Sequence, residues 1–176
     1  MEMPVDTAQF AIDLPGTNDW DNVELLRGAV QSCVSAMFGQ DDDSETVAMI
    51  VGELLENAVK YGAWGENARW FRLRVWSDQG RVHVSVESPV RSPDGPDIRR
   101  VMETISWIDT FPSAEEAYAA KLIEVAARPR GQKLSQLGLV RIAYEGNCVL
   151  RADVHDRSLR VTATLPAAPR ASASTA

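Results

Sequence analysis

The chain of 176 residues has few of the residues that build a disulfide framework or a metal centre. It contains two cysteines and two histidines, and neither Cys33 nor Cys148 has a CxxC partner or histidine-rich surroundings. Both cysteines fall inside apolar periodic segments, so we expect two buried free thiols and a reducing compartment. A disulfide-stabilised scaffold and a zinc site are therefore not expected.

Long apolar runs and an excess of positive charge are also missing. No segment reaches the length of a membrane span, and residues 1–6 lack the basic start and apolar centre of a signal peptide. The net charge is -7, whereas a nucleic-acid-binding surface needs a basic face. We therefore expect a cytoplasmic protein that binds neither nucleic acid nor membrane.

The composition suits one compact domain. Hydrophobic residues make up 45% of the chain, which is enough for a single core in a chain of this length. No internal repeat is visible. We expect one domain over residues 1–165 and a disordered C-terminal tail over residues 166–176, which are mostly small and polar.

The period of the hydrophobic pattern predicts an alternation of strands and helices. Apolar residues at every second position predict strands at 9–14, 70–76, 81–87, 148–153 and 158–165. Apolar residues at every third and fourth position predict helices at about 17–39 and 44–62, and another helix starts at 137. The proline-rich stretch between them contains shorter helical pieces at 98–108 and 113–127. Its length and irregularity predict a lid over about 88–136.

The second predicted helix carries three functional groups at helical spacing. Glu53, Asn57 and Lys60 share one stripe of this helix, next to an apolar stripe. A polar stripe beside an apolar one suits a helix that forms one wall of a pocket. Taken alone, the same spacing also occurs on solvated helix surfaces.

The string that runs from Glu53 to Gly62, E-L-L-E-N-A-V-K-Y-G, resembles the N-box of the GHKL ATPase superfamily. That superfamily includes histidine-kinase ATPase domains and the small anti-sigma-factor serine kinases. By this resemblance Glu53 is the catalytic residue that activates a water or hydroxyl, Asn57 binds the magnesium ion on the phosphates, and Lys60 lies near the phosphate chain. The resemblance therefore implies ATP and Mg²⁺ as cofactors.

A second motif and the order of elements extend the resemblance over nearly the whole chain. Residues 135–140, S-Q-L-G-L-V, resemble the glycine motif at the end of the ATP lid, which implies nucleotide contacts at Gly138 and Leu139. Gln136 replaces the first glycine of that motif, so we expect a weaker or differently built phosphate site. A glycine that serves only tight helix packing is the alternative.

The implied fold is the Bergerat fold of the GHKL ATPases. It is an α+β two-layer sandwich in which helices pack on one face of a mixed, largely antiparallel sheet.

The family's adenine motif, D-x-G-x-G, is missing after the second strand of the hairpin. The register of that strand puts Ser88 at the position of the aspartate. A serine hydroxyl can still bond an amino group, but it is neutral and short, so we expect lower adenine selectivity. Asp94 and Asp97 follow a few residues later, at a spacing that fits the motif poorly.

The loss of this aspartate makes the chain similar to stand-alone bacterial regulators that resemble SiaB-type protein kinases. Its histidines, His83 in a strand and His155 in a turn, offer no phospho-acceptor helix. The resemblance implies ATP-dependent phosphorylation of a serine or threonine of a partner in signal transduction, either an anti-anti-sigma-like protein or a sigma factor. The alternative is an inactive scaffold that binds such a partner without turnover. Relatives dimerise through the N-terminal strand and first helix, and the sequence leaves a homodimer open.

Overall fold

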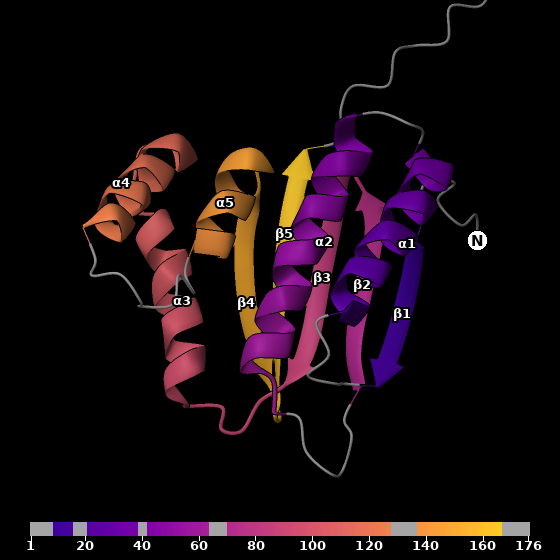
Figure 1. Cartoon of the computed structure of the whole chain (residues 1–176), viewed down its shortest axis with the longest axis horizontal. Helices are drawn as coiled ribbons and strands as arrows, with labels where there is room; N and C mark the ends of the chain where they lie inside the picture. The colour runs from indigo at the N-terminus through magenta and orange to yellow at the C-terminus, as the bar shows by residue number, and fades with distance from the viewer. Residues whose placement is uncertain (1–8, 16–20, 39–41, 64–69, 128–136, 167–176) are drawn as a thin grey trace, which may run out of the picture.

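The computed structural model describes residues 9–15, 21–38, 42–63, 70–127 and 137–166. Ten elements follow one another along these segments (Figure 1). They are β1 (Gln9–Pro15), α1 (Asp21–Phe38), α2 (Asp42–Tyr61), β2 (Trp70–Asp78), β3 (Arg81–Pro89), α3 (Pro96–Ile108), α4 (Ala114–Ala126), α5 (Leu137–Glu145), β4 (Val149–His155) and β5 (Ser158–Pro166).

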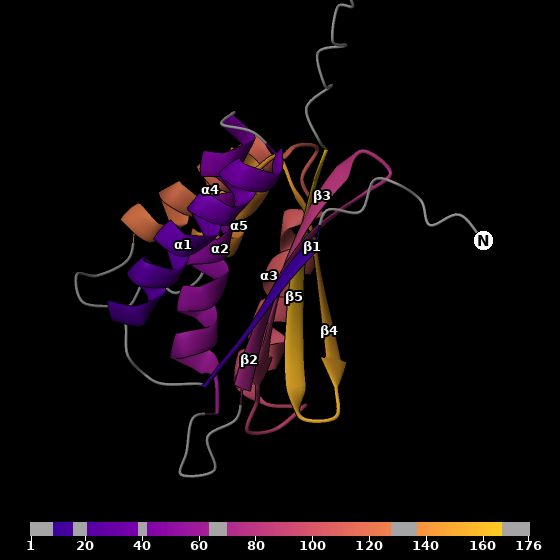
Figure 2. The same cartoon turned by 90° about the vertical axis from the view of Figure 1, so that its right-hand side faces the viewer.

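The strands form one sheet in the order β1-β2-β3-β5-β4, and each of its four described pairings is antiparallel. Figure 2 shows the helices α1, α2 and α4 on the same side of this sheet. The predicted α+β sandwich, with helices on one face of a largely antiparallel sheet, is confirmed.

The alternating strands direct their apolar side chains toward the helices. Leu73 and Val75 of β2 and Val84 of β3 are fully buried, and they belong to the same core as the apolar stripe of α2. Ile50 and Leu54 lie on that stripe and are also fully buried. This packing fixes the rotation of α2, so its polar stripe lies beside the core and not opposite it.

The opposite face of the sheet is polar. Glu87 accepts a hydrogen bond from Arg160 Nη2 at 2.7 Å, and Arg72 Nε donates to Asp13 at 2.6 Å. His83 stacks on Trp76 with their ring centres 4.8 Å apart, and burial lowers the pKa of His83 below its usual value. The prediction that His83 is a partly exposed strand residue is therefore confirmed.

The two cysteines have different environments. Cys148 is buried, as expected, and burial raises the pKa of its thiol to about 12. Cys33 is exposed on α1, so the expectation of a buried thiol there is wrong. Val30 and Val34 define the buried stripe of α1, and Cys33 lies about 100° around the helix from Val34.

The segment predicted as a lid contains the helices α3 and α4, which confirms both shorter helical pieces. At the start of α4, Ser113 Oγ accepts a hydrogen bond from the Glu116 backbone N–H at 3.2 Å. Residues 128–136 and 167–176 lie outside the described residues, so the lid and the disordered tail stay predictions. Among the described helices, none is long and apolar enough to cross a membrane.

Candidate functional site

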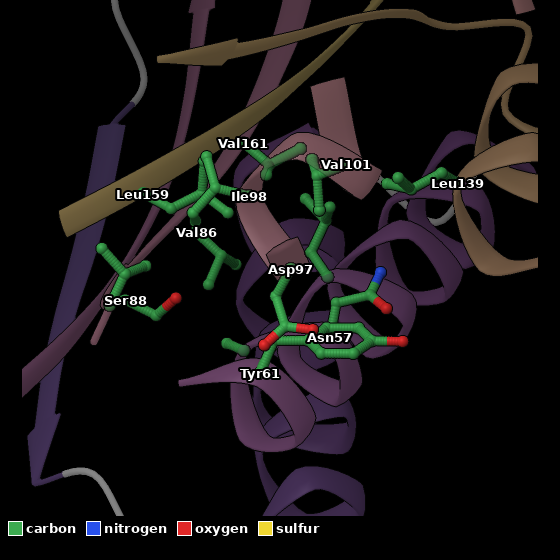
Figure 3. A pocket seen from close by; sticks show the side chains of 13 residues that line it. Asn57, Tyr61, Val86, Ser88, Asp97, Ile98, Val101, Leu139, Leu159 and Val161 are labelled. Atoms are coloured by element: carbon green, nitrogen blue, oxygen red, sulfur yellow. The ribbon is translucent and has the colours of Figure 1, made fainter. Parts of the chain in front are cut away.

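A small pocket lies between α2, α3, the start of α5 and the sheet (Figure 3). Apolar side chains form most of its walls, and they are Leu54, Ala58, Val86, Val90, Ile98, Val101, Leu139, Leu159 and Val161. Its polar lining comes from Asn57, Tyr61, Ser88 and Asp97. The cavity volume of about 30 Å³ has room for roughly two water molecules. A larger ligand therefore requires one wall to move.

Asn57 carries an unsatisfied polar atom in this region. Its amide nitrogen Nδ2 is buried and has no hydrogen-bond partner among the described residues. A buried donor without a partner costs roughly 1–3 kcal/mol, so such groups call for an explanation. A ligand with an acceptor atom would satisfy this donor.

Helix α5 begins against the polar stripe of α2, so the two sequence motifs meet. A Cβ atom at residue 138 would lie 2.6 Å from Glu53 Oε2 and 3.7 Å from Asn57 Nδ2. Only glycine permits this approach without displacing the Glu53 carboxylate. The alternative of a glycine that serves tight helix packing therefore agrees with the structure, and the nucleotide contact of Gly138 stays a prediction.

Arg141 of α5 holds the Glu53 carboxylate from the other side. Its Nη1 donates to Glu53 Oε1 at 3.0 Å, and its Nε donates to Glu145 Oε2 at 2.9 Å. The hydrogen bond to Glu145, and then that to Glu53, raise the pKa of Arg141 above its usual value. The sequence analysis missed this contact, because Arg141 is 88 residues from Glu53.

The other predicted site residues lie at different depths. Ser88 and Leu139 are buried and line the pocket from β3 and α5. Figure 3 shows the Ser88 hydroxyl directed toward the cavity. Lys60 is exposed and lies outside the pocket lining, with its Nζ 5.3 Å from the centre of the Tyr61 ring.

Asp97 lines the pocket, although its sequence spacing counted against it. Figure 3 shows its side chain extending from α3 toward Asn57 and Tyr61. The signal in the sequence was the start of a helix, because Gly95 is the N-cap of α3 and Pro96 occupies its first turn. A helix that begins there places Asp97 near α2 in space. The number of residues between Asp97 and the second strand of the hairpin does not predict this proximity.

A second, more polar cavity of about 270 Å³ opens on the other side of Glu53. Side chains of α1, α2 and α5 line it, and they are Arg27, Gln31, Glu45, Ala48, Met49, Gly52, Glu53, Glu56 and Arg141. Glu53 therefore faces a cavity of its own, one helical turn away from the pocket that Asn57 lines.

Residues 17–117 match the family model of the histidine kinase-like ATPase domain. This match spans more than half of the chain and contains α1, α2, β2, β3 and α3. The chain belongs to the histidine kinase-like ATPase family. Members of this ATPase family in general bind ATP together with Mg²⁺.

Among solved structures, the chain is similar to one chain of the crystal structure of the SiaB-SiaC complex from Pseudomonas aeruginosa. The TM-score is 0.61 at 19% sequence identity, and the likeness covers 88% of each chain. This likeness extends the shared fold beyond the matched family domain. No curated protein matches the chain.

The described residues fit the phosphate end of the family's ATP site. Asn57 offers an unpaired buried amide, and at the start of α5 the lack of a side chain at Gly138 lets the backbone approach Glu53 and Asn57 closely. Its first backbone N–H groups are of the kind that bind anions. The D-x-G-x-G adenine motif of the family is missing, and Ser88 occupies the position that the register of β3 predicts for its aspartate.

Proposed function

We propose that this histidine kinase-like ATPase binds Mg-ATP and phosphorylates a serine or threonine of a regulatory protein partner in signal transduction. The observation that carries the proposal is the junction of α2 and α5. A carboxylate (Glu53), a buried unpaired amide (Asn57) and a glycine at a helix start (Gly138) meet there.

Asn57 and the start of α5 would hold the phosphate end of the nucleotide. A carboxamide has a carbonyl oxygen for a hard cation such as Mg²⁺ and an NH₂ group for a phosphate oxygen. The N–H groups in the first turn of α5 add donors and a favourable dipole. Leu139 would close the apolar pocket over the adenine ring. Lys60 would contribute positive charge from outside the pocket.

Glu53 is the proposed base, and Arg141 orients it. The hydroxyl oxygen of the partner would attack the γ-phosphorus of bound ATP, the bond from that phosphorus to the bridging oxygen would break, and ADP would leave with the bonding electrons. The Glu53 carboxylate would accept the proton of the attacking hydroxyl. The polar cavity on the far side of Glu53 offers a partner's hydroxyl a route that does not cross the nucleotide pocket. Positioning and electrostatics would provide most of the rate acceleration.

A protein partner is supported by the fold shared with a chain from a complex of two proteins. The partners to test are an anti-anti-sigma-like protein, a sigma factor and, for a homodimer, a second copy of this chain.

An inactive scaffold is the second candidate, and two observations favour it. The Arg141 guanidinium is bonded to the carboxylate that would act as base, and the adjoining pocket has a volume of only about 30 Å³. A scaffold would keep this closed arrangement, whereas a kinase must open it.

A Glu53→Gln substitution tests the kinase proposal. We expect it to retain Mg-ATP binding in titration calorimetry and to lower phosphoryl transfer by about 10²-fold or more, because glutamine cannot accept the proton. Transfer is measured with Mg-[γ-³²P]ATP in an ATP-depleted extract of cells that lack this gene.

A label that appears only with the parent protein, mapped to a serine or threonine, supports the kinase. Mg-ATP binding without any dependent label supports the scaffold. The absence of heat at millimolar Mg-ATP with the parent refutes the nucleotide site itself.

Gly138→Ala tests the junction without a large effect on stability. The new Cβ would displace the Glu53 carboxylate and break its hydrogen bond to Arg141. This pair is partly exposed, so we expect a loss of unfolding free energy below about 1 kcal/mol. We expect weaker Mg-ATP binding, measured by calorimetry, and a parent-like affinity would argue against phosphate contacts here.

A further inference from the structure

We propose that Asp97 recognises the adenine base and takes over the role of the aspartate that Ser88 replaces. Its carboxylate would accept a hydrogen bond from the 6-amino group of adenine, so the site would discriminate 6-amino from 6-oxo purines. The proposal rests on the nucleotide binding proposed above and names the residue that gives this binding its base specificity.

The walls of the pocket suit the faces of a flat heteroaromatic ring once one wall has moved, because the closed cavity of about 30 Å³ is too small for such a ring. Val86 and Val161 come from the sheet, Ile98 and Val101 from α3, and Leu139 from α5. All five side chains are buried and belong to one hydrophobic core. Apolar walls with a few polar groups are typical of sites for small molecules, in which the polar groups fix orientation and specificity.

Among the polar groups of the described residues that line the pocket, only Asp97 is restricted to accepting hydrogen bonds. Asn57, Tyr61 and Ser88 each have both a donor and an acceptor, and so can adapt to an amino or an oxo group. An ionised carboxylate has no proton to donate to a purine O6 atom. Asp97 is therefore the group that can discriminate between the two classes of base.

Asp97 is directed at the pocket and is available to a ligand. Figure 3 shows its side chain extending from α3 into this pocket. No hydrogen bond or ion pair of this carboxylate is found in the part of the chain that the structure describes, even though Arg100 lines the same recess. Its position in the first turn of α3 stabilises the negative charge, but that effect does not depend on the pocket.

The neighbouring Asp94 provides a matched control. It is exposed and lies on a different groove, with Pro93, Met102 and Glu103. Asp94→Asn removes the same charge three residues away from Asp97→Asn. A general effect of net charge on nucleotide affinity would appear in both variants.

Titration calorimetry with Mg-ATP and Mg-ITP tests the proposal, because inosine has an oxo group in place of the 6-amino group of adenosine and, with it, a proton on N1. We expect the parent protein to bind ATP at least about tenfold more tightly than ITP, in line with one hydrogen bond to a charged group. We expect Asp97→Asn to remove this preference through weaker ATP binding, with unchanged or tighter ITP binding, since a carboxamide can donate to O6.

The Asp94→Asn variant should keep the parent's ratio of affinities within about twofold. Equal affinities of the parent for the two nucleotides, or a preference that persists in Asp97→Asn, would overturn the role of Asp97 and leave nucleotide binding standing. The absence of binding of both nucleotides to the parent would refute the proposed function instead. Asp97 is exposed, so the variant should fold, and its thermal melting curve checks this.

Discussion

Asn57→Ala is expected to lower the affinity for Mg-ATP by about 10-fold to 100-fold without destabilising the fold. A hydrogen bond to a charged group is worth about 1.5–3 kcal/mol, and each 1.4 kcal/mol corresponds to roughly a factor of ten in affinity. The variant loses both the proposed donor to phosphate and the proposed ligand of Mg²⁺. Titration calorimetry measures the affinity.

The expected effect of Asn57→Ala on stability has the opposite sign from that of most buried substitutions. Asn57 Nδ2 is buried without a partner, and such a group costs roughly 1–3 kcal/mol in the ligand-free protein. Its removal should therefore leave the melting temperature unchanged or raise it. If the ligand-free protein becomes more stable when Asn57 is removed, then this residue lowers the stability of the fold for the sake of ligand binding.

Glu56→Ala is the control for this experiment, because it changes a polar side chain on the same helix that lies outside the nucleotide pocket. Its Mg-ATP affinity should match that of the parent. Parent-like binding by Asn57→Ala would contradict the proposed contact. A lower melting temperature of Asn57→Ala would instead show that the amide stabilises the ligand-free fold.

Gly146→Ala is expected to lower the free energy of unfolding by about 1–3 kcal/mol or more. A Cβ atom at this position would lie 2.5 Å from the Ile142 carbonyl oxygen and 2.7 Å from Cys148 Sγ. The first of these atoms belongs to the backbone of α5, so it cannot rotate away. Gly146 is buried behind Ile50 and Ile142, which leaves the new methyl group no other space.

Urea unfolding of the Gly146→Ala and Gly28→Ala variants measures this effect against a matched control. Gly28 lies inside α1, and no atom of the described residues that could obstruct a Cβ there lies within 4 Å of its position. Because glycine is a poor helix former, Gly28→Ala should raise the free energy of unfolding by about 0.5–1 kcal/mol. The same substitution should thus have opposite signs at the two positions, and a Gly146→Ala variant as stable as the parent would refute the packing described here.

The sequence predicted the elements whose cause is local. Alternation identified β2 and β3, and the spacing of apolar residues identified α2 and the side of it that faces the core. Each of these predictions rests on periodicity within one element, which a sequence states directly.

The predictions that were wrong or incomplete concern features that depend on how the helices pack against one another and against the sheet. Cys33 lies one residue from the buried stripe of α1, and periodicity is least certain at the edge of a stripe. Asp97 and Arg141 reach the site from α3 and α5, and only the packing of these helices against α2 brings them there. Sequence spacing could exclude Asp97 from a linear motif but could not exclude it from a pocket.

Because Cys33 is exposed and Cys148 is buried, the protein can be labelled with a thiol reagent at a single position without any substitution. Thiol reagents attack the thiolate, which is scarce at a buried cysteine with a raised pKa, and Cys148 is such a cysteine. Cys33 is exposed on α1, which packs against the helix that carries Asn57. A fluorescent dye at Cys33 would therefore report distances from α1 to a nucleotide analogue or a partner protein without any engineered residue.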